Sequence, residues 1–147
     1  MAISPDVIGR ELPAVAVDVE RGRLRFFAAA IGETDPVFSD LAAARAAGHP
    51  DLPVPPTFLF GLDLEASDLT ALLAGLGVDL RRVLHGEQSF TYHSPAHAGE
   101  TLTFAPRIAD VYSRKGGALE FLVKETAVSR AGGTAVAELR STIVVRA

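Results

Sequence analysis

One segment of the chain is apolar on nearly every side, and it constrains the fold more than any other. Residues 57–66 read TFLFGLDLEA, and a helix that lacks a polar face has to be buried. Four prolines, at positions 50, 53, 55 and 56, precede this segment. Because proline fixes φ and biases its predecessor away from helix, they predict a stiff extended loop. We expect the helix to open at Pro56 or Thr57, since proline is tolerated in a first turn.

From residue 83 onward the apolar pattern has a period of two, which is typical of strands. Four alternating stretches follow one another: VLHGEQSFTYH, TLTFAPRIADVYS, ALEFLVKETAVS and TAVAELRSTIVVR. The last three are separated by the glycine turns RKGG and RAGG, and tight glycine turns between strands predict an antiparallel meander. Pro106 is expected to interrupt the second stretch or place it at an edge.

The N-terminal part combines one short strand with helices. AVAVDVE, from Ala14 to Glu20, alternates like a strand. Leu24, Phe27, Ala28 and Ile31 share one helix face. Asp40 and Ser67 are candidate N-caps of two further short helices. Helices followed by strands predict an α+β fold, a single domain over residues 1–147 in which an antiparallel sheet wraps around the apolar helix.

Composition excludes several classes of protein. Net charge is −4 and lysine and arginine form no block, so a nucleic-acid partner is not expected. Without cysteine there is no disulfide or cysteine-ligated metal site, and cytoplasmic residence is permitted. No apolar run approaches the roughly 20 residues of a membrane span, and the N-terminus lacks a signal-peptide pattern. We therefore expect a cytoplasmic protein.

Two stretches carry a resemblance to a known family. VERGRLRFFAAAIGETDPVFSD and VLHGEQSFTYHSPAHAGETL, with VPPTFLF between them, resemble the N-terminal MaoC-type, or FAS1-like, dehydratase domain, which includes the HadA-type subunits of (3R)-hydroxyacyl dehydratases. The resemblance implies a hot-dog fold, work on acyl thioesters of CoA or acyl-carrier protein without a further cofactor, and pairing with a second hot-dog chain.

The catalytic motif of that family is altered in this chain. It reads glycine, aspartate, any residue, asparagine, proline, any residue, histidine, and here the sequence is GETDPVF. Glu33 stands at the aspartate position and Phe38 at the histidine position. Acid–base catalysis needs a group that exchanges a proton. A phenyl ring cannot do so, and the matching positions therefore do not supply the dyad.

Several residues remain as site candidates, each with a structural alternative. Glu33 or Asp35 is a lone base, or both belong to a solvated turn in which Asp35 binds backbone amides. Phe38 lines an acyl channel or belongs to the core. Pro56, Thr57 and Phe58 lie where free helix amides would meet a thioester carbonyl, or they merely cap the helix and brace the loop.

The histidines give one further candidate pair. His85 and Glu87 lie two apart, share a face of a regular strand, and form either a relocated acid–base pair or a structural contact. His93 and His97 are expected to be exposed, and no ligand-spaced cluster predicts a metal site.

Three hypotheses follow. In the first, the chain is a subunit of an (R)-specific enoyl-thioester hydratase or (3R)-hydroxyacyl-thioester dehydratase, and a partner hot-dog chain supplies the Asp/His dyad. In the second, it is a self-sufficient homodimeric hydratase or thioesterase that uses Glu33, Asp35 or the His85–Glu87 pair. In the third, it is a non-catalytic acyl-CoA-binding or assembly protein, because fold does not fix function.

Overall fold

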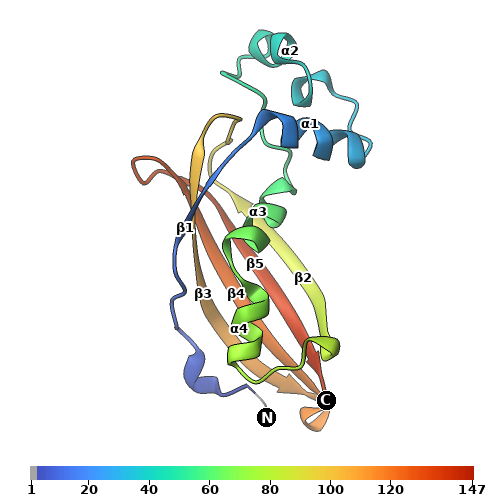
Figure 1. Cartoon of the computed structure of the whole chain (residues 1–147), viewed down its shortest axis with the longest axis vertical. Helices are drawn as coiled ribbons and strands as arrows, with labels where there is room; N and C mark the ends of the chain where they lie inside the picture. Colours follow the sequence, from blue (N-terminus) through green and yellow to red (C-terminus); the bar gives the residue numbers. More distant parts are fainter. Residues whose placement is uncertain (1–2) are drawn as a thin grey trace.

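The computed structural model describes residues 3–147 and is built on one five-stranded antiparallel sheet (Figure 1). The strand order is β1-β3-β4-β5-β2. The strands are β1 (Val15–Asp18), β2 (Val83–Tyr92), β3 (Thr101–Arg114), β4 (Leu119–Arg130) and β5 (Ala135–Arg146). β3, β4 and β5 form the predicted meander, and the chain therefore has the expected α+β architecture.

Helices occupy one face and one end of this sheet. α3 (Phe58–Ala66) and α4 (Leu69–Gly75) lie across one face, whereas α1 (Arg21–Ala30) and α2 (Leu41–Ala46) lie beyond one end of it (Figure 1). Short 3₁₀ turns are η1 (Pro5–Val7), η2 (Pro36–Phe38), η3 (Leu80–Arg82) and η4 (Lys115–Gly117). No helix within residues 3–147 is long and apolar enough to cross a membrane.

Two clusters of buried side chains form the core between the helices and the sheet. One joins α3 to β3 and β5 and contains Leu59, Leu62, Phe104 and Leu139. The other lies under α4 and includes Leu73 and Ile143. The sheet therefore buries the face that carries α3 and α4.

The apolar helix is buried on most sides but not on all, which corrects the expectation of full burial. Phe58, Leu59 and Leu62 are buried, whereas Phe60 is half-buried and Leu64 is 43% exposed. Phe60 stacks on the ring of His85 in β2 at a centroid distance of 5.0 Å. α3 is therefore open on the side that faces β2.

The two predicted N-terminal helices form as expected, with one exception on the predicted apolar face of α1. Asp40 caps α2 by accepting from the Ala42 amide at 2.9 Å. In α1, Leu24 and Ala28 are buried, but Ile31 lies at the C-cap and is 53% exposed. α1 ends at Ala30, because Gly32 with φ 73° redirects the chain. Ile31 therefore does not join the buried face of the helix.

A buried polar cluster ties α3 to β4, and it consists of Asp63, Ser67, Lys124 and Thr126. The Lys124 ammonium donates to Asp63 at 2.9 Å and to Ser67 at 3.0 Å. Thr126 donates to the second Asp63 oxygen at 2.9 Å. Ser67 is therefore not the N-cap of α4. Asp68 takes that role through the Ala71 amide.

The two edges of the sheet differ in length. β1 is a four-residue strand that pairs with β3. Pro106 of β3 lies past the last residue pair of this β1–β3 ladder, so the N–H that proline lacks is not needed for a hydrogen bond to β1. β2 has ten residues and, within the described residues, pairs with β5 alone. It is largely exposed. β2 thus presents the longer free edge.

Candidate functional site

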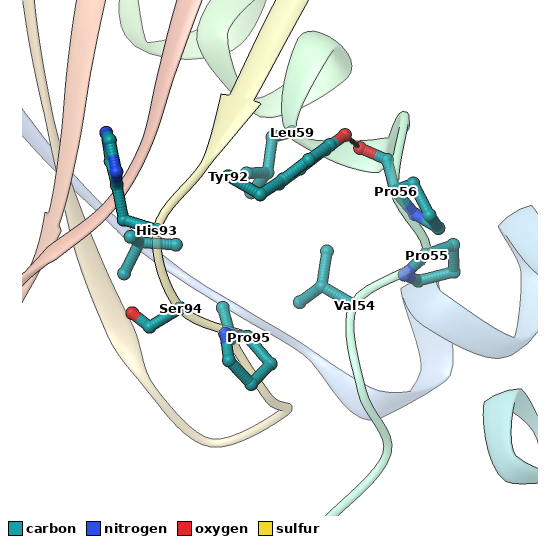
Figure 2. Close-up of a pocket in the computed structure, with 10 residues that line it drawn as sticks. Val54, Pro55, Pro56, Leu59, Tyr92, His93, Ser94 and Pro95 are labelled. Atoms are coloured by element: carbon teal, nitrogen blue, oxygen red, sulfur yellow. Dashed lines mark hydrogen bonds between the residues drawn. The ribbon is translucent and has the colours of Figure 1, made fainter.

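A pocket of about 350 Å³ opens between the N-terminal end of α3 and the C-terminal end of β2 (Figure 2). We call it the α3–β2 pocket. Its lining residues are Val54, Pro55, Pro56, Leu59, Tyr92, His93, Ser94, Pro95, Ala96 and Val136. Most of these side chains are apolar, as expected of a site for a small organic ligand.

Two chain segments distant in sequence build the walls of this pocket. The Val54 amide donates to the Ala96 carbonyl at 2.8 Å, and the Ala98 amide donates to the Leu52 carbonyl at 2.9 Å. We call residues 49–56, on the α3 side, the strap. Its prolines lack amide donors and have a fixed φ, which suits a short rigid wall.

Tyr92 closes one side of the pocket. Its hydroxyl donates to the Pro56 carbonyl, and burial raises the pKa of this phenol (Figure 2). The pair of stacked rings Phe90 and Tyr92, at 5.8 Å, continues along β2. The alternation of the sequence placed both rings on one face, but it contained no signal that the strap would meet them.

The start of α3 only partly matches the expected oxyanion site. The Phe58 amide donates to the Pro55 carbonyl at 3.0 Å, and the Phe60 amide donates to the Thr57 carbonyl at 3.2 Å. Thr57 is exposed and its side chain makes no cap hydrogen bond. Two of the first amides are thus engaged in local turns.

The four predicted substrate-binding residues separate in the structure. Pro56 lines the α3–β2 pocket. Phe58 is buried and packs edge-on against Phe27 at 5.2 Å, in the core. Thr57 and Phe38 are not among the lining residues, and Phe38 is half-buried in η2.

The altered motif lies in an exposed loop between α1 and α2, residues 31–40, which we call the motif loop. Glu33 accepts from the Asp35 amide at 3.0 Å, and Asp35 accepts from the Val37 amide at 3.1 Å. Both side chains are exposed. In this chain alone, the two carboxylates therefore shape a turn.

His85 and Glu87 do not share a face, contrary to the expectation from regular alternation. A β-bulge at Gly86 shifts the register, so that His85 lies opposite Ile143 and Glu87 lies opposite Thr142. Adjacent residues of β5 point to opposite faces. His85 consequently faces α3, whereas Glu87 faces the other side of the sheet.

The remaining histidines also divide. His93 is exposed as expected, and its Nε2 lies 3.1 Å from a Glu138 oxygen. It borders the pocket, but its ring points away from Tyr92 and Leu59 (Figure 2). His97 contradicts the expected exposure, since its side chain is only 12% exposed and its Nε2 lies 3.0 Å from the Nδ1 of His49. Among residues 3–147, no three His, Asp or Glu side chains converge as metal ligands.

Curated relatives match nearly the whole chain. A UPF0336 protein of Clavibacter michiganensis is 43% identical over 99% of this chain and 97% of its own length. A UPF0336 protein of Saccharopolyspora erythraea is 37% identical over 99% of this chain and 93% of its own length.

Solved structures of similar shape include subunits of two-chain complexes. A chain of the Mycobacterium tuberculosis HadBC (3R-hydroxyacyl-ACP dehydratase) complex is 26% identical, with a TM-score of 0.81 over 95% of this chain and 97% of that chain. A chain of the ChsH1-ChsH2 complex from the same organism shares the fold at 24% identity, with a TM-score of 0.73 over 93% of this chain and 89% of that chain. These neighbours confirm the hot-dog fold.

The family model described as "FAS1-like, dehydratase domain region" matches residues 6–139. The resemblance expected from the sequence is thereby confirmed at the level of the family. The chain belongs to the FAS1-like dehydratase domain family.

Proposed function

We propose that this chain is the acyl-holding subunit of an (R)-specific enoyl-thioester hydratase or (3R)-hydroxyacyl-thioester dehydratase. A partner hot-dog chain contributes the Asp/His dyad. The reaction adds water to a trans-2-enoyl thioester, or removes water from a (3R)-3-hydroxyacyl thioester. The substrate is a thioester of CoA or of acyl-carrier protein, and no further cofactor takes part.

The altered motif loop is the observation that carries this proposal. Phe38 offers no proton, and the Glu33 carboxylate is exposed and hydrogen-bonded to the Asp35 amide. General acid–base catalysis is typically worth about 10²–10⁴-fold in rate, and it needs a positioned group with a suitable pKa. The Glu33 carboxylate is turned into its own loop rather than toward the α3–β2 pocket, which supports an external source for the dyad.

The α3–β2 pocket supports the acyl-holding role. It is lined mainly by aliphatic and proline side chains and lies beside the first turn of α3. An aliphatic chain gains about 0.8 kcal/mol for each methylene that leaves water. The Tyr92 hydroxyl and the N-terminal end of α3 also lie at this pocket. The polar thioester group of the substrate would be placed beside them.

The free edge of β2 supports a second chain as partner. An exposed strand of ten residues presents unpaired backbone groups to another strand. The HadBC and ChsH1-ChsH2 neighbours are named as complexes of two proteins. A partner that adds to the β2 edge would extend the sheet next to the pocket.

The test is to assay crotonyl-CoA hydration with the chain alone, with a MaoC-type partner alone and with both together. We expect turnover of the mixture to exceed the sum of the separate proteins by about 10²-fold or more. We expect Glu33→Gln in this chain to leave the mixture unchanged. Fast turnover by the lone chain that Glu33→Gln abolishes would overturn the proposal.

A matched pair of variants tests the pocket. Val54→Phe fills the wall of the α3–β2 pocket, whereas Val15→Phe makes the same change on the exposed strand β1. Only the first should raise the KM of the mixture for crotonyl-CoA. Equal effects of the two variants would place acyl binding elsewhere.

A second candidate is a self-sufficient homodimeric hydratase or thioesterase, as the sequence also allowed. One observation favours it, although it concerns residues that the sequence did not offer for this role: His93 lines the α3–β2 pocket, and its Nε2 lies 3.1 Å from a Glu138 oxygen. A loss of lone-chain turnover in His93→Gln, with the fold retained, would select this candidate. Acyl-CoA binding without turnover in every mixture would instead select a non-catalytic binder.

A further inference from the structure

The His49–His97 hydrogen bond joins the helical end of the molecule to the loop that carries the pocket. His49 follows the C-terminal end of α2, and its amide donates to the Ala44 carbonyl at 3.0 Å. His97 lies between β2 and β3. The two ring nitrogens are 3.0 Å apart and the ring centroids are 5.2 Å apart. No other side-chain hydrogen bond described for residues 3–147 links the strap directly to residues 94–98.

This bond lies directly behind the wall of the α3–β2 pocket. Pro53 and His97 form an isolated antiparallel bridge, flanked by the Val54–Ala96 and Ala98–Leu52 hydrogen bonds. Val54 and Ala96 both line the pocket. The imidazole pair and these two backbone hydrogen bonds therefore hold the same stretch of the strap against the same loop.

The number of protons decides whether the bond can exist. A hydrogen bond between two imidazoles needs one N–H donor and one nitrogen with a free lone pair. A neutral pair satisfies this requirement, and so does a pair that carries one extra proton. A second extra proton removes the acceptor and places two cations side by side in a half-buried site, where their repulsion is poorly screened.

The surroundings of the pair favour its uncharged form at His97. Burial lowers the pKa of His97, the nearby His49 lowers it further, and Glu100 opposes the shift. The Glu100 carboxylate lies 3.9 Å from the other ring nitrogen of His97 and is itself held by Arg130. The charged groups that act on His97 are Glu100 from the loop before β3, Arg130 from β4 and Asp51 from the strap. Asp51 is in turn paired with Arg21 of α1 and lies near Arg45 of α2.

We propose that the His49–His97 pair is a proton-operated latch that positions the strap and thereby sets the width of the α3–β2 pocket. The latch is closed while the pair carries at most one extra proton. Protonation of both rings releases residues 49–56 from residues 94–98 and opens the pocket. That the opened pocket admits an acyl thioester more freely rests on the proposed function, whereas the latch itself does not.

Hydrogen exchange of the Val54 and Ala98 amides from pH 5 to pH 8 reads the latch directly. After correction for the intrinsic pH dependence of exchange, their protection should fall as the pH decreases. The fall is about tenfold for each unit by which the pKa of the open state exceeds that of the closed state. The amide of Leu122, within the β4–β5 ladder, should keep its protection.

Three glutamine variants separate the latch from a general effect of acid. His49→Gln and His97→Gln retain hydrogen-bonding side chains that cannot be protonated, so they should flatten the pH profile at Val54 and Ala98. His93→Gln removes an exposed histidine outside the latch and should leave the wild-type profile. The chain alone and the chain with its partner should behave alike.

Three results would overturn the latch. They are a flat profile in the wild type, an unchanged slope in both latch variants, and a parallel loss of protection at Leu122. If the variants do not fold, the wild-type imidazole resonances still decide, because a latch requires His49 and His97 to titrate as a coupled pair. A pocket that opens but binds no crotonyl-CoA counts against the proposed function and not against the latch.

Discussion

The motif loop and the buried polar cluster use carboxylates in opposite ways. Glu33, in the motif loop, is exposed and accepts a hydrogen bond from a neighbouring amide. Asp63, in the buried polar cluster, is 1% exposed and binds Lys124, Thr126 and Ser67. Low-dielectric surroundings would tune a catalytic acid, but in this chain they enclose a carboxylate that is fully engaged in holding α3 on the sheet. The comparison teaches that the enclosed carboxylate of this chain serves the scaffold, whereas the carboxylate at the altered motif position lies in an exposed turn.

The largest expected effect comes from breaking the buried polar cluster. Asp63→Ala leaves the Lys124 ammonium buried without a counter-charge, and we expect the free energy of unfolding to fall by about 3–5 kcal/mol. Urea unfolding followed by circular dichroism at pH 7 measures it. The exposed pair of Arg81 and Asp79 gives a matched control, since Arg81→Met should leave the free energy of unfolding nearly unchanged.

A double substitution separates charge burial from packing in the same cluster. Asp63→Leu with Lys124→Met replaces the ion pair by apolar groups of similar size, and it should recover most of the lost stability. A double variant as unstable as Asp63→Ala would show that the hydrogen bonds of Ser67 and Thr126, rather than the unpaired charge, dominate the cluster.

The next effect tests the motif loop by restoring what it lacks. Glu33→Asp with Phe38→His rebuilds the Asp/His dyad of the family motif, and we expect crotonyl-CoA hydration by the lone chain to rise by about 10²-fold, the lower end of acid–base catalysis. Phe26→His with Glu33→Asp is the control, because Phe26 is 78% exposed on α1 and lies outside the motif. Equal rates in the two variants would mean that the motif loop does not face the substrate.

A smaller effect is expected at the α3–β2 pocket. Val54→Phe removes space for about two methylenes of an acyl chain, and at about 0.8 kcal/mol per methylene the affinity for acyl-CoA should fall by about tenfold. Isothermal titration with crotonyl-CoA and a longer acyl-CoA measures the change. Val15→Phe should bind like the wild type, and a tenfold loss in that variant would contradict the assignment of the pocket.

The smallest effect concerns the exposed ion pair of Arg21 and Asp51 at the base of the strap. The hydrogen bond from Arg21 lowers the pKa of Asp51 to about 2. The pair therefore stabilises the fold above the ordinary carboxyl pKa, and this contribution is lost as the pH falls toward 2. Arg21→Met should lower the free energy of unfolding slightly at pH 7 and hardly at all near pH 2, as measured by urea unfolding at both pH values. A cost that persists unchanged at pH 2 would assign the effect to lost packing of the arginine stem.

Local patterns predicted the elements of the fold and the altered motif well. The alternation after residue 83 and the glycine turns predicted β2 to β5, and Asp40 predicted the start of α2. The exchanged dyad positions were readable because a motif is a contiguous stretch. The family and the hot-dog fold followed from such stretches together.

The site was less predictable because long-range contacts assemble it. Nothing local pairs the strap with residues 94–98, so the pocket wall, the Tyr92–Pro56 contact and the His49–His97 bond had no signal in the sequence. The local sequence indicates a helix cap at Ser67. It gives no sign of the buried partner, Lys124, which lies 57 positions away. Phe58 was expected to contact the ligand, but its ring packs on Phe27 in the core. The side of α3 that faces the core is decided by tertiary packing, which the local sequence does not encode.

The bulge in β2 has a consequence for what mutation can reach. An added Cβ at Gly86 would lie 2.7 Å from a Val144 methyl and 3.2 Å from the Thr142 carbonyl, so a larger residue there collides with β5. The strand is out of phase on either side of this glycine. His85 and Glu87 would share a face only if Gly86 took a regular place in the ladder, and that would need one more residue in β5 between Thr142 and Ile143. The geometry of this single extra residue thus keeps the imidazole of His85 and the carboxylate of Glu87 on opposite sides of the sheet.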